Sequence, residues 1–253
     1  MNPKRIAVLA ITRPGVALGG RLVAALPGAH LFVPAALGPR AAVAAPGAYT
    51  GYDGPTRDQM PGLFTDWGAI IAIFSLGVLV RLIAPHLRDK YRDPAVLVLD
   101  EAGRFVIPVL SGHLGGANAL AGHVALVLGA TAVLTTASDV QQTLAVDLLG
   151  RELGWTLEAN SVDLLRASAA VVNGEPVALV QESGSPDWWR GHANGRNGPL
   201  PSNLHCLDPG KAVDLASYRA LLWIGSGPPP ASLTAGFGGP VIVYLAKEST
   251  LVR

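Results

Sequence analysis

Short apolar runs that alternate with segments of helical periodicity constrain this chain more than any other feature of its sequence. The runs at 6–12 and 69–74 are each followed by a segment with apolar residues at helical spacing, at 16–26 and 77–87. Strands that alternate with helices favour a mainly parallel sheet covered on both faces. We therefore predict an α/β fold, with a mainly parallel sheet flanked by helices and a smaller second α/β domain.

The alternation continues along the chain, where 30 glycines and 20 prolines indicate many short elements joined by tight turns. The further strands predicted are 30–33, 95–99, 105–110 as the hairpin partner of 95–99, 132–135, 176–181, 221–224 and 241–245, and the further helices are 115–128, 143–153 and 161–170. Long loops are expected at 35–61, with room for one short helix, and at 183–210. We predict two domains, 1–140 and 141–253.

Composition narrows the classes of function. The chain of 253 residues carries 19 basic against 18 acidic residues, so no overall field attracts nucleic acid or acidic lipid. Cys206 is the only cysteine in the sequence, which excludes an internal disulfide and fits a reducing compartment. The apolar run at 6–11 is too short for a signal sequence, and 69–80 is too short to cross a bilayer. We expect a cytoplasmic protein.

A set of spaced motifs in a fixed order lies between Leu63 and Asp139. It comprises Leu63-Phe64, 73–85, 88–90, 93–96, 98–101 with Gly103, 111–118 (Ser-Gly-His-Leu-Gly-Gly-Ala-Asn) and 135–139 (Thr-Thr-Ala-Ser-Asp). This set closely resembles the amino-terminal domain of the CbiG family of cobalamin biosynthesis. Weaker similarity at 145–147, 172–177 and 181–182 resembles the family's middle domain. The predicted domains are therefore CbiG amino-terminal-like and CbiG middle-like.

The resemblance implies an enzyme of the anaerobic cobalamin pathway, which hydrolyses the ring A lactone of cobalt-precorrin-5A and releases acetaldehyde to give cobalt-precorrin-5B. Cobalt belongs to the substrate, so no cofactor or metal of the protein's own is expected. Full-length members continue into a third domain, and we expect its role to be supplied by another polypeptide or to be dispensable. The expected partners are the cobalt-corrin intermediate, a separate carboxy-terminal-type CbiG protein or a precorrin methyltransferase, and a second copy of the chain in a homo-oligomer.

The glycine-rich segment 112–118 is the first candidate site. It lies between a predicted strand and a predicted helix, where the first helical N–H groups lack partners inside the helix. Such a turn can hold an anion or an oxyanion, with the amides of Gly115 and Gly116 and the side chain of Asn118 as donors. Ser111 and Gly112 join the substrate-binding candidates. The competing interpretation is a tight turn that caps a helix.

Three ionisable residues are candidates for the chemistry. His113 can take and return a proton near neutral pH, although a turn histidine that bonds the backbone is the alternative. Asp100 and Glu101 follow a predicted strand, where a carboxylate could orient His113 or polarise water. Acidic residues are also common in plain hairpin turns. His123 is expected to be a core or surface histidine.

Basic residues between 81 and 92 form the densest charged cluster and could grip the carboxylates of a corrin precursor. Of these we favour Arg81 and Lys90, since both match the family motif, over His86, Arg88 and Arg92. A solvated helix end with local ion pairs is the alternative. Thr136 and Asp139 are further substrate-binding candidates, because ligands of open α/β sheets bind beyond the carboxyl ends of strands. A helix N-cap is the competing explanation for Asp139.

Two rival functions stay open. The first is a non-catalytic corrinoid-binding or scaffold subunit of the same pathway, which hands precursors to a methyltransferase. The second is a nucleotide-binding α/β protein, but the glycine spacing matches neither the Gly-x-Gly-x-x-Gly fingerprint nor the P-loop. No Gly-x-Ser-x-Gly elbow is present, so a covalent serine mechanism is not indicated. Residues His192, His205 and Cys206 have no standard metal spacing and are expected to be loop residues.

Overall fold

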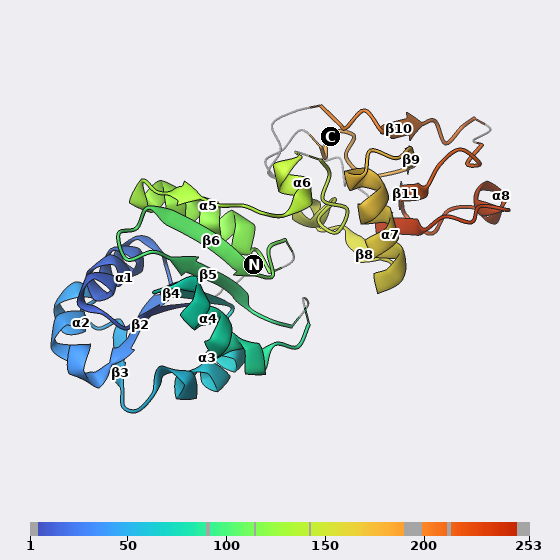
Figure 1. The fold of residues 1–253 in the computed structure, drawn as a ribbon. Helices are drawn as coiled ribbons and strands as arrows, with labels where there is room; N and C mark the ends of the chain where they lie inside the picture. Colours follow the sequence, from blue (N-terminus) through green and yellow to red (C-terminus); the bar gives the residue numbers. More distant parts are fainter. Residues whose placement is uncertain are drawn as a thin grey trace. The chain divides into compact units, whose positions relative to one another are not determined.

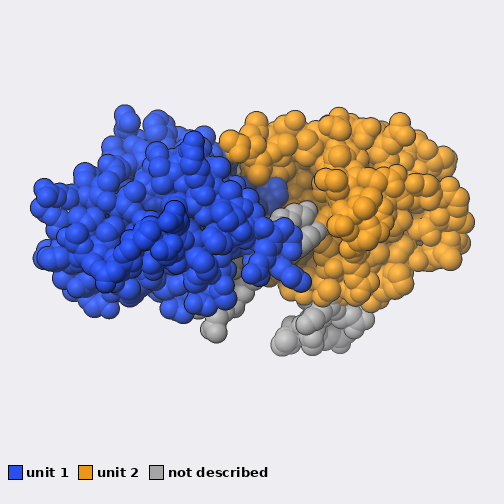
Figure 2. Space-filling view, turned by 60° about the horizontal axis from the view of Figure 1, so that its bottom comes forward, with its two compact units in different colours: residues 1–134 blue, residues 135–253 orange. Residues whose placement is uncertain are grey.

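The computed structural model describes residues 5–89, 92–113, 115–141, 143–189, 199–211 and 214–246. The chain divides into two compact units, residues 1–134 and 135–253 (Figure 2). Each unit has a sheet and a hydrophobic core of its own. Within the described residues, no helix is both long enough and apolar enough to span a membrane.

The described part of unit 1 is built on a seven-stranded sheet in the order β3-β2-β1-β4-β5-β6-β7. Its strands are β1 (Ile6–Ala10), β2 (Ala29–Pro34), β3 (Tyr49–Tyr52), β4 (Ala69–Ile73), β5 (Ala95–Leu99), β6 (Phe105–Leu110) and β7 (Thr131–Ala132). Strands β3, β2, β1, β4 and β5 pair in parallel, β6 returns antiparallel to β5, and β7 runs parallel to β6. Strands β1, β4 and β5 are buried throughout, as expected of central parallel strands covered on both faces.

Helices cover both faces of this sheet (Figure 1). The helical elements are α1 (Arg13–Ala25), η1 (Ala35–Leu37), α2 (Gly38–Ala44), η2 (Thr56–Gln59), α3 (Met60–Asp66), α4 (Leu76–Ile83), η3 (Ala84–His86) and α5 (Ala117–Leu128). Side chains of α1, α2 and α5, such as Leu22, Ala41 and Val124, share one core with the sheet. Side chains of α3 and α4, such as Leu63 and Leu79, form the core on the opposite face.

The described part of unit 2 contains a five-stranded sheet in the order β10-β9-β11-β12-β8. Its strands are β8 (Thr156–Glu158), β9 (Val177–Gln181), β10 (Leu204–Leu207), β11 (Ala220–Gly225) and β12 (Val241–Leu245), and its helical elements are α6 (Ala137–Val140), η4 (Arg151–Leu153), α7 (Ser161–Val172) and α8 (Ala231–Thr234). Only β8 is antiparallel to its neighbour β12; the other pairs are parallel. Helix α7 packs its buried face, including Leu164 and Ala167, against one side of the sheet.

The prediction of a mainly parallel α/β fold is confirmed, and so is the hairpin between 95–99 and 105–110. The predictions for three segments were wrong. Residues 35–61 contain η1, α2, β3, η2 and the start of α3 rather than one long loop with room for one short helix. Residues 143–150 are coil and turns rather than helix, and the predicted loop 183–210 contains β10. Strand β8 was missed altogether. Such elements are too short for their periodicity to show in the sequence, and their apolar residues are buried by partners distant in the chain.

Candidate functional site

The glycine-rich junction, residues 111–118 between β6 and α5, is shaped by tight steric limits. A Cβ on Gly115 would lie 2.2 Å from the Cβ of Ser111, and a Cβ on Gly112 would lie 2.8 Å from Oδ1 of Asn118. Gly116 has φ 86°, a conformation that glycine adopts without a steric penalty. Ser111, with φ 56°, is the one non-glycine residue in this left-handed region among the described residues. The glycines therefore let the chain fold back on itself at this point.

The amides of Gly116, Ala117 and Asn118 are used inside the junction, which corrects the prediction of an oxyanion donor at Gly116. The N–H of Gly116 donates to the carbonyl of His113 at 3.0 Å, and the N–H groups of Ala117 and Asn118 donate to Ser111 and Gly112 at 3.1 and 3.0 Å. Gly115 also has an interaction partner. Asn118 is only 9 % exposed and packs against Gly112. These bonds take up the donors that a helix start normally leaves open, so the amide of Gly116 is not available to a ligand.

Strand register separates the predicted catalytic residues. In the antiparallel pair of β5 and β6, Val96 lies opposite Leu110 and Leu99 lies opposite Val106. His113 therefore follows the end of β6 beside the start of β5, whereas Asp100 and Glu101 follow the end of β5. At ~3.3 Å per residue, four residues of strand put about 13 Å between these ends. This register counts against the prediction that either carboxylate orients the imidazole of His113.

Asp100 acts within its own turn. Its Oδ1 accepts hydrogen bonds from the backbone N–H groups of Arg104 and Phe105, both at 2.8 Å, and its Oδ2 accepts one from Nε of Arg104 at 3.3 Å. Desolvation raises the pKa of Asp100, but these hydrogen bonds together outweigh it and hold the pKa below its ordinary value. The hairpin-turn interpretation fits this carboxylate.

Glu101 links two elements at the carboxyl edge of the parallel strands. Its carboxylate accepts a hydrogen bond from the hydroxyl of Thr12. Thr12 is also the N-cap of α1, since its Oγ1 accepts from the N–H of Gly15 at 3.2 Å. The contact thus ties the β5–β6 turn to the start of α1.

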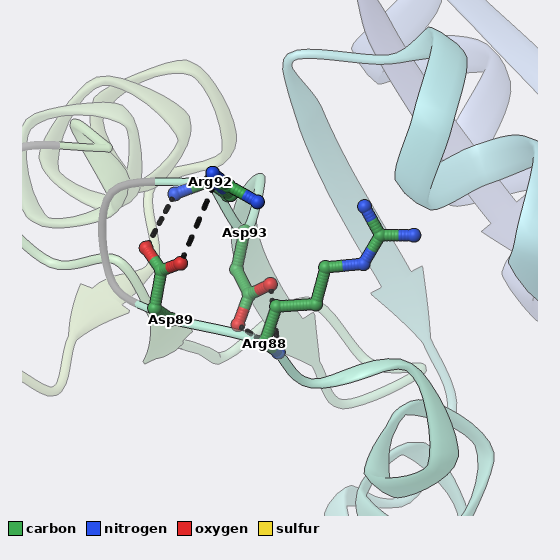
Figure 3. A network of polar contacts seen from close by, with 4 residues as sticks. All are labelled: Arg88, Asp89, Arg92 and Asp93. Carbon is green, nitrogen blue, oxygen red and sulfur yellow. Dashed lines mark hydrogen bonds and ion pairs between the residues drawn. The ribbon is translucent and has the colours of Figure 1, made fainter.

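The loop that precedes β5, residues 87–94 and here called the basic loop, contains two compact carboxylate contacts (Figure 3). The carboxylate of Asp93 accepts from the backbone N–H of Arg88, with both oxygens at 3.1 Å. Asp89 accepts from the backbone N–H of Arg92 at 3.1 Å and forms an ion pair with its Nε at 3.7 Å. The guanidinium of Arg88 points away from both carboxylates (Figure 3). Both acids therefore stabilise the loop itself.

The junction and this loop meet at the same edge of the sheet. The hydroxyl of Ser111 donates to the backbone carbonyl of Asp93 at 3.0 Å. Of the predicted substrate-binding residues, Ser111 and Gly112 are thus brought to the basic loop. Lys90 lies outside the described residues.

A small cavity of about 190 Å³ lies beside this loop. Its lining comprises Pro61, Phe64 and Thr65 of α3 with 85–88, Arg92 and Asp93. The rings of Phe64 and His86 approach to 5.8 Å between centroids. The cavity thus brings together His86, Arg88 and Arg92, the three basic residues that the sequence analysis ranked below Arg81 and Lys90. The sequence signal that could have pointed to these three residues is Phe64, which belongs to the same family-like set of motifs.

The remaining candidates lie elsewhere. Arg81 is exposed on α4, and its Nη1 donates to the carbonyl of Gly77 one turn earlier at 2.9 Å. Thr136 and Asp139 belong to unit 2, where the hydroxyl of Thr136 donates to the carboxylate of Asp139 across the single turn of α6. Thr136, and not Asp139 as the capping alternative expected, is the N-cap residue of α6, and Asp139 lies in the first turn of that helix.

No three His, Cys, Asp or Glu side chains gather closely enough to hold a metal ion within the part of the chain that the structure describes. His205 and Cys206 lie on the exposed part of β10, and His205 contacts the ring of Tyr218. His192 lies outside the described residues.

Comparisons with known proteins give a consistent picture. Residues 58–139 match the family region described as "Cobalamin synthesis G N-terminal", and residues 144–224 match "Cobalamin biosynthesis central region". The chain is 48 % identical over 171 residues to a cobalt-precorrin-5A hydrolase of Priestia megaterium, with 68 % of this chain and 44 % of that protein covered. It is 39 % identical over 189 residues to the cobalt-precorrin-5A hydrolase of Salmonella typhimurium, with 75 % and 49 % covered.

The chain spans about half the length of these curated relatives. Among solved structures, a cobalamin biosynthesis protein G homolog from Sulfolobus solfataricus aligns at 15 % identity with a TM-score of 0.48, covering 96 % of this chain and 60 % of that one.

Proposed function

Because this chain belongs to the CbiG family of cobalamin biosynthesis, whose amino-terminal and central regions it contains, we propose that it opens the ring A lactone of cobalt-precorrin-5A and releases acetaldehyde. The product of this reaction is cobalt-precorrin-5B. The observation that carries the proposal is the ordered match of both family regions together with relatives named as hydrolases of this substrate at 48 % and 39 % identity. Identity of this level over at least 171 residues supports a shared reaction and not only a shared fold.

The basic loop supports binding of a substrate of this class. A corrin precursor carries acetate and propionate side chains, and arginine can hold a carboxylate through two parallel hydrogen bonds. The cavity of about 190 Å³ beside Arg88 and His86 has room for one such side chain, whereas the macrocycle would lie outside it. We assign this cavity to one carboxylate arm of the substrate.

His113 is the proposed general base, held by a junction whose backbone is fixed by the hydrogen bonds described above. In the first step it takes a proton from water as the water oxygen bonds to the lactone carbonyl carbon. The ring C–O bond then breaks, and the proton passes to the leaving oxygen, giving a secondary alcohol and a carboxylic acid that loses its remaining proton to solvent. In the second step the alcohol loses its proton and the adjacent C–C bond breaks in a retro-aldol sense. The fragment leaves as acetaldehyde, and the ring carbon takes up a proton.

Acetaldehyde release from cobalt-precorrin-5A tests this function. We expect the purified chain to release one equivalent of acetaldehyde per substrate, measured by coupling to an alcohol dehydrogenase and following NADH. The same assay with a carboxy-terminal region of a full-length relative added in trans shows whether activity requires it. Absence of acetaldehyde under both conditions would refute the proposal.

A second function is favoured by the internal use of the junction's donors. With the N–H of Gly116 bonded and Asn118 buried, unit 1 offers less oxyanion stabilisation than the sequence suggested. This favours a subunit that binds the corrinoid without converting it. Retention of cobalt-precorrin-5A on the chain with no aldehyde released under either condition would establish this alternative.

A further inference from the structure

A groove on the surface of unit 1 lies between α1 and α2, apart from the basic loop and the junction. It has a volume of about 540 Å³ and is lined by Arg13, Val16 and Ala17 of α1 and by Pro39, Arg40, Val43 and Ala44 of α2. These residues precede both segments matched by the family regions, which begin at residue 58. The function proposed above assigns them no role.

Helix packing explains why the groove opens where it does. The two helices touch at Gly20 and Ala44, where a Cβ on Gly20 would lie 2.5 Å from the carbonyl oxygen of Ala44. Arg13 and Arg40 stand one to two turns earlier in their helices, towards the amino ends. Because α1 follows β1 and α2 follows β2 in a parallel pair, these amino ends lie at the carboxyl edge of the strands. Ligands of open α/β sheets bind at this edge.

Charge and polarity within the groove indicate the kind of ligand. In the part of the chain that the structure describes, the guanidiniums of Arg13 and Arg40 have neither a hydrogen bond nor an ion pair. Apolar side chains line the groove with them, and Val43 is 82 % exposed. Two unpaired arginines and exposed apolar side chains in one groove are complementary to a molecule that carries carboxylates on an apolar frame.

We propose that the α1–α2 groove binds one edge of an amphipathic polycarboxylate, with Arg13 and Arg40 each holding a carboxylate and Ala17 and Val43 contacting the apolar frame. The volume lies within the range of about 300 to 1,000 Å³ typical of small-molecule sites. The chemical class follows from the groove itself. The identification of a corrin precursor as the natural occupant rests on the proposed function.

Binding of cobyrinic acid, a corrin whose side chains end in carboxylates, tests the groove by isothermal titration calorimetry. We expect R13Q/R40Q to weaken binding at least about tenfold, because two charge-assisted contacts are lost. Arg21→Gln is the matched control, since Arg21 is exposed on the same helix but does not line the groove. It should bind within twofold of the unaltered chain. Cobinamide, whose side chains are amides, should bind more weakly than cobyrinic acid.

Val43→Glu is a second variant that leaves both arginines in place. The exposed position tolerates the change sterically, and the added carboxylate should repel the ligand and lower affinity several-fold. If R13Q/R40Q and Arg21→Gln bind cobyrinic acid with equal affinity, at unchanged melting temperature, the proposal that the groove binds this ligand is wrong. If the unaltered chain binds cobyrinic acid in an arginine-dependent way but releases no acetaldehyde, the result counts against the proposed reaction. The proposal for the groove would then still hold.

Discussion

At the scale of single residues, the junction depends on glycines for different reasons. Gly112 and Gly115 leave no room for a Cβ, whereas Gly116 has open space around it and is required for its positive φ. His113 lies within the turn that these glycines make possible. The chemistry proposed for His113 therefore depends on neighbours that carry no functional group.

Replacing Gly115 by Ala should destabilise the chain by about 2 to 3 kcal/mol, because the new Cβ would overlap Ser111. Gly122→Ala is the matched control on α5, where a Cβ meets nothing within 4 Å. That change should stabilise the chain by about 0.5 to 1 kcal/mol. Urea denaturation followed by circular dichroism measures both. Equal stability of the two variants would show that the junction has room for a Cβ at position 115.

His113→Ala should lower kcat for acetaldehyde release by about 10² to 10⁴, the contribution typical of a positioned general base. His123→Ala is the control, since His123 is exposed on α5. Stopped assays with both purified variants, with folding checked by circular dichroism, provide the comparison. Unchanged turnover in His113→Ala would remove this residue from the mechanism.

At the scale of elements, the β5–β6 hairpin decides which residues can act together. Because β6 is antiparallel, the basic loop and the junction share one end of β5 while Asp100 and Glu101 occupy the other. Asp100 accordingly serves the turn by accepting two backbone N–H groups. Glu101 serves the contact with α1 through Thr12.

Asp100→Asn should destabilise the chain by about 1 kcal/mol at neutral pH, since a charged acceptor is replaced by a neutral one. The folded state lowers the pKa of Asp100 below its ordinary value of 3.8, so the carboxylate stabilises the fold above that pH. This contribution is lost as pH falls through the lower folded-state pKa. The difference in unfolding free energy between the two chains should therefore shrink below pH 3.8. A difference independent of pH would contradict the assigned role.

At the scale of the whole molecule, the chain has two units, each with its own sheet and core (Figure 2). Unit 1 buries strands β1, β4 and β5 completely between two helical layers. Such a core contains what an independent fold requires. The junction, the basic loop and the α1–α2 groove all belong to this unit.

A fragment of residues 1–134 should therefore fold alone and unfold cooperatively in urea. It should also retain arginine-dependent binding of cobyrinic acid, since every residue lining the α1–α2 groove is present. Dispersed amide resonances and a single sigmoidal transition are the expected measurements. A fragment without a cooperative transition would show that unit 1 needs unit 2 to fold.

The sequence alone was enough for the α/β class, for most of the longer strands and helices, and for the family, because these depend on local periodicity and on motifs read in order. Residues 69–74 and 95–99 showed as strands since each is continuously apolar. Tertiary structure alone decided which groups at the ends of these strands contact one another. The hydroxyl of Ser111 bonds the carbonyl of Asp93, Glu101 bonds Thr12, and an internal hydrogen bond occupies the amide of Gly116. Convergence of side chains depends on strand pairing between distant residues, and local periodicity does not specify that pairing.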